Sequence, residues 1–423
     1  MTRRALLLVV TLLTLVSLVA GTHAQAPSGE YKIGVLEPLT GNLSSEGKRH
    51  MEGLEVMRDM INERGGVMGK KLVFAVGDAV DPTAAASEAN RLITREGVKI
   101  LTGTFSSTLC GAASEAAARH NVIYWESSCV DPRFNKRGLK NVFRTEIDAT
   151  GFGWYGVEFI AKHLAPKLGM KPNQLKIVFL SEDSSYGQGV TESARDRAKK
   201  EFGMQELGQP EYYNFQSIND FTPIIVRLKQ LNPDIVHHIA RNNDAILFWR
   251  QAREQQFLFK ALVHEGATGY GSPDFGKAFG ADANGPFALL EPGPGFRLAA
   301  LRPEAQKLER DFAAAIKAKT GGIPLGGHQL SASGLWLLKM VLDKAKSDDL
   351  EKFRAAVMSI DLPVGSTLNG WGVKFNAEGQ NTNERVQHYM LQWQGGDLVT
   401  VWPEEFTEKR AKWIPLPPWD QRK

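Results

Sequence analysis

Strand-like and helix-like segments alternate along most of this chain, and this alternation restricts the fold more than any other feature of the sequence. In the first part of the chain, four short apolar runs are predicted to be strands: 32–36, 72–76, 100–101 and 122–125. The segments between them carry apolar residues at helical spacing; in 47–64, for example, Met51, Leu54, Met57 and Ile61 would share one helix face. A β–α–β succession of this kind predicts a parallel sheet flanked by helices.

The alternation restarts after 142–145 and gives a second α/β block, with predicted strands at 176–180, 235–239 and 261–263. The Pro- and Gly-rich run 291–295 indicates a linker. Three predicted helices follow at 303–320, 329–345 and 350–358, and then two predicted antiparallel strands at 373–375 and 386–393. Because a single core rarely exceeds about 250–300 residues, a chain of 423 residues with two such blocks is predicted to form two α/β domains.

The first 24 residues have the features of a secretory signal peptide. Arg3 and Arg4 precede an unbroken apolar run from 5 to 20, and Thr22 and Ala24 are small residues at the positions that determine cleavage. A membrane anchor is the alternative, but the run is shorter than the ~20 apolar residues that a spanning helix needs. We therefore expect cleavage after Ala24 and a mature protein in the periplasm.

Charge and motifs exclude several classes of function. Removing Arg3 and Arg4 lowers the formal net charge from +4 to +2, which argues against nucleic acid or an anionic membrane as the partner. The run 65–70 lacks the spacing of a phosphate loop, and the histidines at 237, 238 and 264 lack that of a zinc helix. No nucleophile elbow is present. The chain is therefore predicted not to be an enzyme and to bind no cofactor or metal.

Small hydroxyl residues follow two neighbouring strands of the first block. Ser106 and Ser107 come after the third strand and lead into a helix, and Ser127 and Ser128 follow the fourth. Ligands of open α/β sheets bind beyond the carboxyl ends of the strands, where helix N-termini offer N–H groups to anions. One such loop would suggest only helix capping. Several loops at one sheet edge, the Ser- and Thr-containing loop 38–44 among them, predict a carboxylate site.

The two cysteines, Cys110 and Cys129, flank these serine loops. A pair of cysteines in an exported protein favours a disulfide, and loops after adjacent parallel strands lie close enough for Cα atoms within ~7 Å. Two buried free thiols are the alternative. Phe105 and Trp125 lie in the same region and would either enlarge an aromatic pocket or fill the core.

The second block offers charged residues at the equivalent loops. Glu265 follows its third strand, and Asp148 lies where the chain passes from the first block to the second. Either carboxylate could receive the ammonium of a zwitterion whose carboxylate meets the serines, although each could also be a solvated or capping residue. Arg241 is interpreted as binding a second carboxylate or as pairing with a neighbouring acid.

The same segments resemble the leucine/isoleucine/valine-binding proteins, the type I periplasmic substrate-binding proteins of ABC importers. The resemblance covers nearly the whole mature chain in the same order and rests on these motifs: KIGVLEPLTGN, NERGGVMGKK, ILTGTFSS, VFRTEIDA, LSEDSSYGQG, VHEGATG and WGVKFNAEGQN.

The resemblance implies an α/β fold of two lobes joined by three hinge crossovers, with ligand-induced closure. The N-lobe would hold 30–146 and 292–364, the C-lobe 147–291 and 365–400, and 401–423 would form a tail. It further implies that Ser106, Ser107, Ser127 and Ser128 bind the ligand carboxylate, that Tyr186 lines the C-lobe side and that Glu265 binds the ammonium.

These features predict a monomeric periplasmic protein that captures an amino acid of the branched-chain or a related type and delivers it to permease subunits in the inner membrane. The run 240–242, which contains Arg241, departs from the residues common in amino-acid binders. An aromatic acid, an amide or urea is therefore an alternative ligand. A periplasmic ligand sensor is an alternative role.

Overall fold

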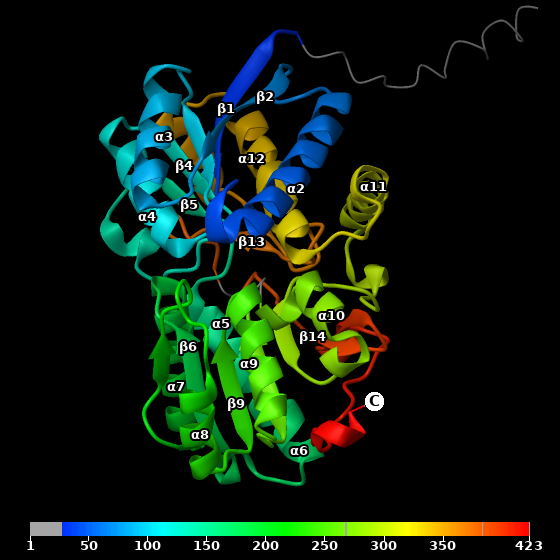
Figure 1. Ribbon diagram of the computed structural model, residues 1–423. Coiled ribbons are helices and arrows are strands. Elements are labelled where there is room, and N and C mark those ends of the chain that lie inside the picture. The colour runs from blue at the N-terminus through cyan, green and yellow to red at the C-terminus, as the bar shows by residue number, and fades with distance from the viewer. Residues whose placement is uncertain (1–27, 267–268, 383, 423) are drawn as a thin grey trace, which may run out of the picture.

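The computed structural model describes residues 28–266, 269–382 and 384–422. The predicted signal peptide at 1–24 lies outside the described residues. Figure 1 shows two α/β lobes, one above the other, with the N-terminal strands in the upper lobe and the last segments of the chain in the lower one. The predicted fold class is confirmed. None of the helices in the described ranges has the length and apolar character needed to cross a membrane.

The N-lobe is built on a parallel sheet of five strands in the order β2-β1-β3-β4-β5. The strands are β1 (Glu30–Glu37), β2 (Lys71–Asp78), β3 (Ile100–Gly103), β4 (Ile123–Glu126) and β5 (Val142–Arg144). Helices α3 (Pro82–Thr94) and α4 (Ser107–Arg119) cover one face of this sheet. The other face is covered by α2 (Ser44–Glu63), α11 (Pro303–Thr320), α12 (Gly326–Ala345) and α13 (Leu350–Met358).

The predicted helix faces explain this packing. In α2, Leu54, Met57 and Ile61 are buried in one core, so the 3.6-residue spacing marks the face that meets the sheet. Helix α12 packs closely on α2, and Gly53 permits the approach, because a methyl group there would lie 2.5 Å from the carbonyl oxygen of His328. The N-lobe core therefore needs residues from both ends of the chain.

The C-lobe is built on a mixed sheet of eight strands in the order β15-β14-β11-β10-β9-β6-β7, with β8 also paired to β6. Its strands are β6 (Lys176–Glu182), β7 (Gln205–Glu206), β8 (Glu211–Tyr213), β9 (Ile235–Ile239), β10 (Ala261–Glu265), β11 (Phe287–Leu290), β14 (Tyr389–Gln394) and β15 (Asp397–Trp402). Only β14 and β15 run antiparallel to their neighbours. Helices α5 (Ala149–Phe159) and α7 (Ser185–Lys200) lie on one face, with α8 (Thr222–Leu231), α9 (Asn242–Glu254) and α10 (Pro273–Phe279) on the other.

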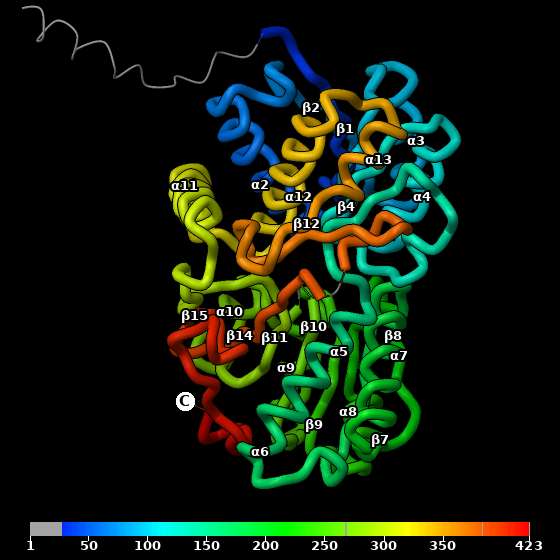
Figure 2. Tube along the Cα trace, turned by 180° about the vertical axis from the view of Figure 1, so that it is seen from behind, coloured from blue at the N-terminus to red at the C-terminus, as the bar shows by residue number. Residues whose placement is uncertain are grey.

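Three segments cross between the lobes. The first joins β5 to α5, and the second joins β11 to α11. The third follows the short antiparallel pair β12 (Asp361–Leu362) and β13 (Val373–Lys374) and leads into β14. Figure 2 shows the first of these segments leading into α5 and the second leading to α11 at the opposite edge of the molecule.

Two predicted boundaries differ from the structure. The C-lobe was expected to resume at 365, but Val373 and Phe375 pack in the N-lobe core, and Gln380 bridges to Arg144 at the edge of β5. The return to the C-lobe therefore comes after Asn381. The stretch 401–423 was expected to be a tail that wraps over a lobe. Its first two residues instead complete β15, which runs to Trp402, and farther on Leu416 and Trp419 are buried in the C-lobe core.

Candidate functional site

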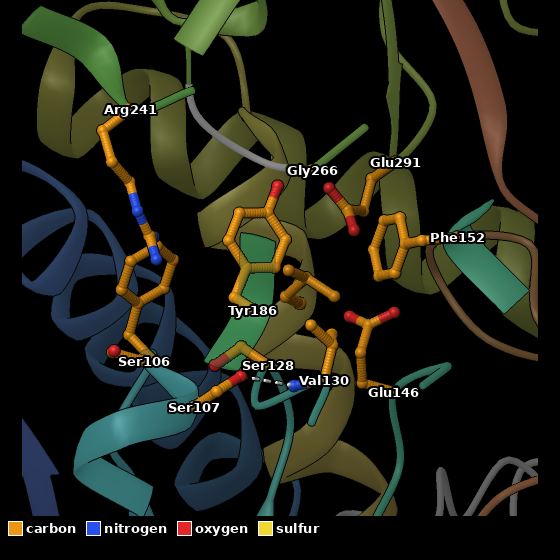
Figure 3. Close-up of a pocket in the computed structure, with 12 residues that line it drawn as sticks. Ser106, Ser107, Ser128, Val130, Glu146, Phe152, Tyr186, Arg241, Gly266 and Glu291 are labelled. Atoms are coloured by element: carbon orange, nitrogen blue, oxygen red, sulfur yellow. Dashed lines mark hydrogen bonds between the residues drawn. The ribbon is translucent and has the colours of Figure 1, made fainter. Parts of the chain in front are cut away.

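A cleft between the lobes brings together residues from the carboxyl ends of both sheets and from the crossovers (Figure 3). Its lining comprises Phe105, Ser106, Ser107, Ser128, Val130, Leu330, Glu146, Phe152, Tyr186, Arg241, Gly266 and Glu291. This is the position at which open α/β sheets bind ligands. Six of the predicted ligand-binding residues line it, namely Phe105, Ser106, Ser107, Ser128, Tyr186 and Arg241.

Ser106 and Ser107 stand at the start of α4, directly after β3. The turn between them and the strand needs a glycine, because Gly103 has a φ of 108° and a methyl group there would lie 1.8 Å from the Leu36 carbonyl oxygen. The Ser107 hydroxyl oxygen accepts the N–H groups of Val130 and Asp131, at 3.3 and 3.2 Å. Its own proton can therefore be donated elsewhere. Together with the first-turn amides of α4, these hydroxyls suit a carboxylate.

Glu126, at the end of β4, holds the two serine loops against each other. Its Oε1 accepts the N–H groups of Ser127, Ser128 and Cys129 at 2.9, 2.9 and 3.2 Å. Its Oε2 accepts the N–H of Thr104 at 3.1 Å. Burial raises the pKa of this carboxyl to about 7, against the opposing effect of these hydrogen bonds. Glu126 is not among the predicted site residues, although its position at the end of a buried strand is a signal for it.

Substituting Glu126→Gln is expected to lower the free energy of unfolding by about 1–3 kcal/mol, because the amide NH₂ would face the Thr104 N–H and leave it without an acceptor. The affinity for ligand should fall as well, since both serine loops depend on this side chain. Urea unfolding and calorimetric titration measure the two effects. The Glu115→Gln variant on the exposed side of α4 is the control, and equal behaviour of the two variants would contradict the role given to Glu126.

The structure joins Cys110 and Cys129 in a disulfide, with 6.4 Å between their Cα atoms. Cys110 lies in the first turn of α4, and Cys129 follows Ser128. The bond therefore links the two elements that present serine hydroxyls to the cleft.

Arg241 and Tyr186 form the C-lobe side of the cleft. The Arg241 guanidinium donates two hydrogen bonds to the buried Glu182 carboxylate, at 2.6 and 2.9 Å. Of the two interpretations of Arg241, the pairing with a neighbouring acid is therefore observed, and the guanidinium still lines the cleft. It lies over the Tyr186 ring at 4.8 Å and over the N-lobe ring of Phe105 at 5.8 Å. The side chain thus contacts both lobes.

Glu265, expected to receive an ammonium, lies outside the cleft lining. Its carboxylate points into the C-lobe interior, where Oε1 is 3.0 Å from Nε2 of His237. A methyl group on Gly156 of α5 would lie 1.5 Å from this oxygen, which shows how closely the acid packs on the helix. Only the backbone of this segment reaches the cleft, through Gly266, while the Glu265 carbonyl accepts the Tyr186 hydroxyl.

Three other predicted residues also lie outside the lining. Trp125 is fully buried in the N-lobe core, where its Nε1 donates to the Gly334 carbonyl at 2.8 Å. Ser127 is buried against Gly334 as well. Asp148 caps α5 by accepting the Gly151 N–H at 3.2 Å. Each of these three side chains is directed toward its own lobe, and the sequence does not specify that direction.

Six lining residues were not predicted: Val130, Glu146, Phe152, Gly266, Glu291 and Leu330. Both carboxyls are buried, and burial raises the pKa of Glu146 well above its ordinary value and that of Glu291 to about 7. The sequence did contain signals for them. Glu146 lies in the segment VFRTEIDA, and Glu291 begins the Pro- and Gly-rich linker.

Comparison with known proteins agrees with this architecture. Residues 30–397 match the family described as periplasmic binding protein, which is almost all of the chain after the predicted signal peptide. The chain belongs to this family. It is 34% identical to the Leu/Ile/Val-binding protein homolog 8 of Brucella suis over 387 residues, covering 91% of this chain and 93% of that protein.

Solved structures share the fold at lower identity. The branched-chain amino acid transporter substrate-binding protein LivJ of Streptococcus pneumoniae, in complex with isoleucine, superposes with a TM-score of 0.73 at 20% identity, covering 88% of this chain and 99% of LivJ. A solute-binding protein of an ABC transporter from R. palustris, in complex with benzoate, superposes with a TM-score of 0.70 at 19% identity, covering 88% and 95%. The predicted family resemblance and the two-lobed fold are confirmed.

Proposed function

We propose that this protein is the solute-binding component of an ABC importer and captures an amino acid, of the branched-chain or a related type, in the cleft between its lobes. The arrangement of the cleft is the observation that carries this proposal. Hydroxyls and helix amides for a carboxylate come from the N-lobe, and an aromatic ring with a guanidinium comes from the C-lobe, so one small solute would contact both lobes.

The arrangement of the two lobes is suited to binding a ligand by closing around it. The lobes are joined by three crossovers, and Arg241 of the C-lobe contacts Phe105 of the N-lobe across the cleft. A ligand that bridges the lobes stabilises their closed arrangement in proportion to its preference for that arrangement. The closed form would then dock on permease subunits in the inner membrane, and the protein would act as a periplasmic monomer without catalysing a reaction.

An aromatic acid is the second candidate ligand. Three aromatic rings, those of Phe105, Phe152 and Tyr186, line the cleft. The R. palustris protein of the same fold holds benzoate. A ring between these side chains would gain apolar contact, and its carboxylate would use the same serine loops.

A thermal-shift and native mass-spectrometry panel on the mature protein tests this function. The ligands are leucine, isoleucine, valine, phenylalanine, benzoate, an aliphatic amide and urea. We expect one amino acid per chain and, at 100 times its dissociation constant, a stabilisation of about 2.7 kcal/mol. Ser107→Ala should weaken the shift, whereas Ser347→Ala, near the start of α13 and far from the cleft, should not. Stabilisation by benzoate alone would favour the second candidate, and no shift with any carboxylate would refute both.

A further inference from the structure

Each of the three crossovers places one ionisable side chain in a single buried cluster. Glu146 follows β5 on the first crossover, Glu291 follows β11 on the second, and His388 precedes β14 on the third. Their side chains are at most 2% exposed. One carboxylate oxygen from each acid and one ring nitrogen of the histidine all lie within 4.8 Å of one another. Segments that are far apart in the sequence therefore converge on one point at the hinge.

The hydrogen bonds within the cluster leave it incomplete. Glu146 Oε1 accepts the Ile147 N–H at 3.0 Å and lies 3.1 Å from Nε2 of His388. The imidazole orientation nevertheless makes no hydrogen bond with either acid. Glu291 Oε2 is buried and has no hydrogen-bond partner among the described residues. A buried acceptor without a donor costs free energy, which indicates a missing partner.

The two carboxyls face the cleft. Both line it, whereas His388 lies behind them, against the rings of Phe152 and Trp371. Figure 3 shows Glu146 and Glu291 directed into the pocket on the side of Phe152, with Arg241 and Ser106 on the opposite side and Tyr186 between the two groups. The cleft thus has an end suited to an anion, a largely apolar middle and an end with two acids.

We propose that Glu146 and Glu291 form the ammonium-binding end of the cleft, so that the ligand is an amino acid whose charged amino group lies between the first and second crossovers. This proposal rests on the proposed function. It assigns the ammonium-binding role to Glu146 and Glu291 in place of Glu265, because the Glu265 carboxylate points into the C-lobe and pairs with His237. The donors of an ammonium would satisfy the unpartnered Glu291 oxygen.

The ammonium favours the ionised form of both acids. Burial, and after it the neighbouring Glu146 carboxyl, raises the pKa of Glu291 to about 7, while His388 acts in the opposite direction. Burial likewise raises the pKa of Glu146, which Arg144 lowers and Glu126 raises. Burial lowers the pKa of His388 to about 4, so the imidazole is neutral at pH 7. Binding of an ammonium therefore releases protons, and affinity rises with pH as the carboxyls ionise.

Matched pairs of probes test this proposal: leucine with 4-methylpentanoate, and phenylalanine with 3-phenylpropanoate, which lack only the amino group. Titration calorimetry at pH 7 should show that wild-type protein prefers an amino acid to its partner. The Glu291→Gln and Glu146→Gln variants should each lose about 30-fold or more in affinity for the amino acid. Unchanged affinity for the amino-free probe would show that the variants are folded. The Glu351→Gln variant, on the exposed side of α13, is the control.

The pH dependence of affinity and the release of protons on binding provide a second test. For wild-type protein, the affinity for the amino acid should rise between pH 6 and pH 8, and titrations in buffers of different ionisation enthalpy should show proton release. Both effects should diminish in Glu291→Gln, because its amide does not titrate.

Several results would overturn the proposal. One is retention of the amino-acid preference in both variants, and another is its loss in Glu265→Gln alone. Stabilisation of ligand-free protein by Zn²⁺ or Mn²⁺, abolished in Glu291→Gln, would assign the cluster to a metal. Equal or tighter binding of the amino-free probes would refute the ammonium site and leave capture of a carboxylate intact. The absence of any bound carboxylate would refute the proposed function itself.

Discussion

Replacing Arg241 with alanine is expected to destabilise the protein by about 3–5 kcal/mol, because it leaves a buried carboxylate without its partner. Glu182 is fully buried, and its two oxygens accept the two hydrogen bonds of the guanidinium at 2.6 and 2.9 Å. The substitution also removes the side chain that lies over Tyr186 and Phe105. Urea unfolding followed by tryptophan fluorescence measures the loss, and a change below about 1 kcal/mol would contradict it.

A double variant separates the structural role of Arg241 from its role toward ligand. In Arg241→Met with Glu182→Gln, both charges are removed, so most of the stability should return. The affinity for a carboxylate ligand should remain low, because the positive side of the cleft is still missing. Recovery of both stability and affinity would show that Arg241 serves the fold alone.

Replacing both Cys110 and Cys129 with alanine is expected to lower the free energy of unfolding by about 2–4 kcal/mol, because the disulfide closes a short loop and restricts the unfolded chain. The bonded residues are 19 positions apart. Affinity for ligand should fall too, since the bond holds the start of α4 to the segment that carries Ser128. Thermal unfolding and calorimetric titration measure the two effects.

Reduction provides the control for the disulfide. Dithiothreitol should lower the thermal stability of wild-type protein toward that of the double variant and leave the double variant unchanged. Equal stability of the oxidised, reduced and substituted proteins would contradict a stabilising role for this bond.

The order of strands and helices was predictable because it depends on local periodicity. The segment 235–239 is apolar apart from its histidines and is a buried central strand, and the helix predicted at 303–320 has those bounds in the structure. The serine loops were predictable for a similar reason, since β3 and β4 are parallel neighbours and their following loops must share one sheet edge.

The acid end of the cleft could not be predicted in the same way. Glu146 and Glu291 are 145 positions apart and meet only through the path of the crossovers. For Glu265 the position was predicted correctly, at the end of β10, but the direction of the side chain was not. That direction depends on contacts with Gly156 and His237, which belong to other elements. Alternation along a strand determines which residues share a face, and only the packing of helices on the sheet decides which face meets the cleft.

The use of both early and late segments of the chain in each lobe also determines when that lobe can finish folding. Each lobe combines an early and a late part of the chain: the N-lobe core needs Phe353 of α13, and the C-lobe core needs Leu416 and Trp419, whose indole donates to the Phe257 carbonyl at 2.8 Å. During synthesis from the N-terminus, both cores therefore remain open until nearly the whole chain has left the ribosome. A chain with this arrangement is therefore expected to complete neither lobe before its last segment has been made.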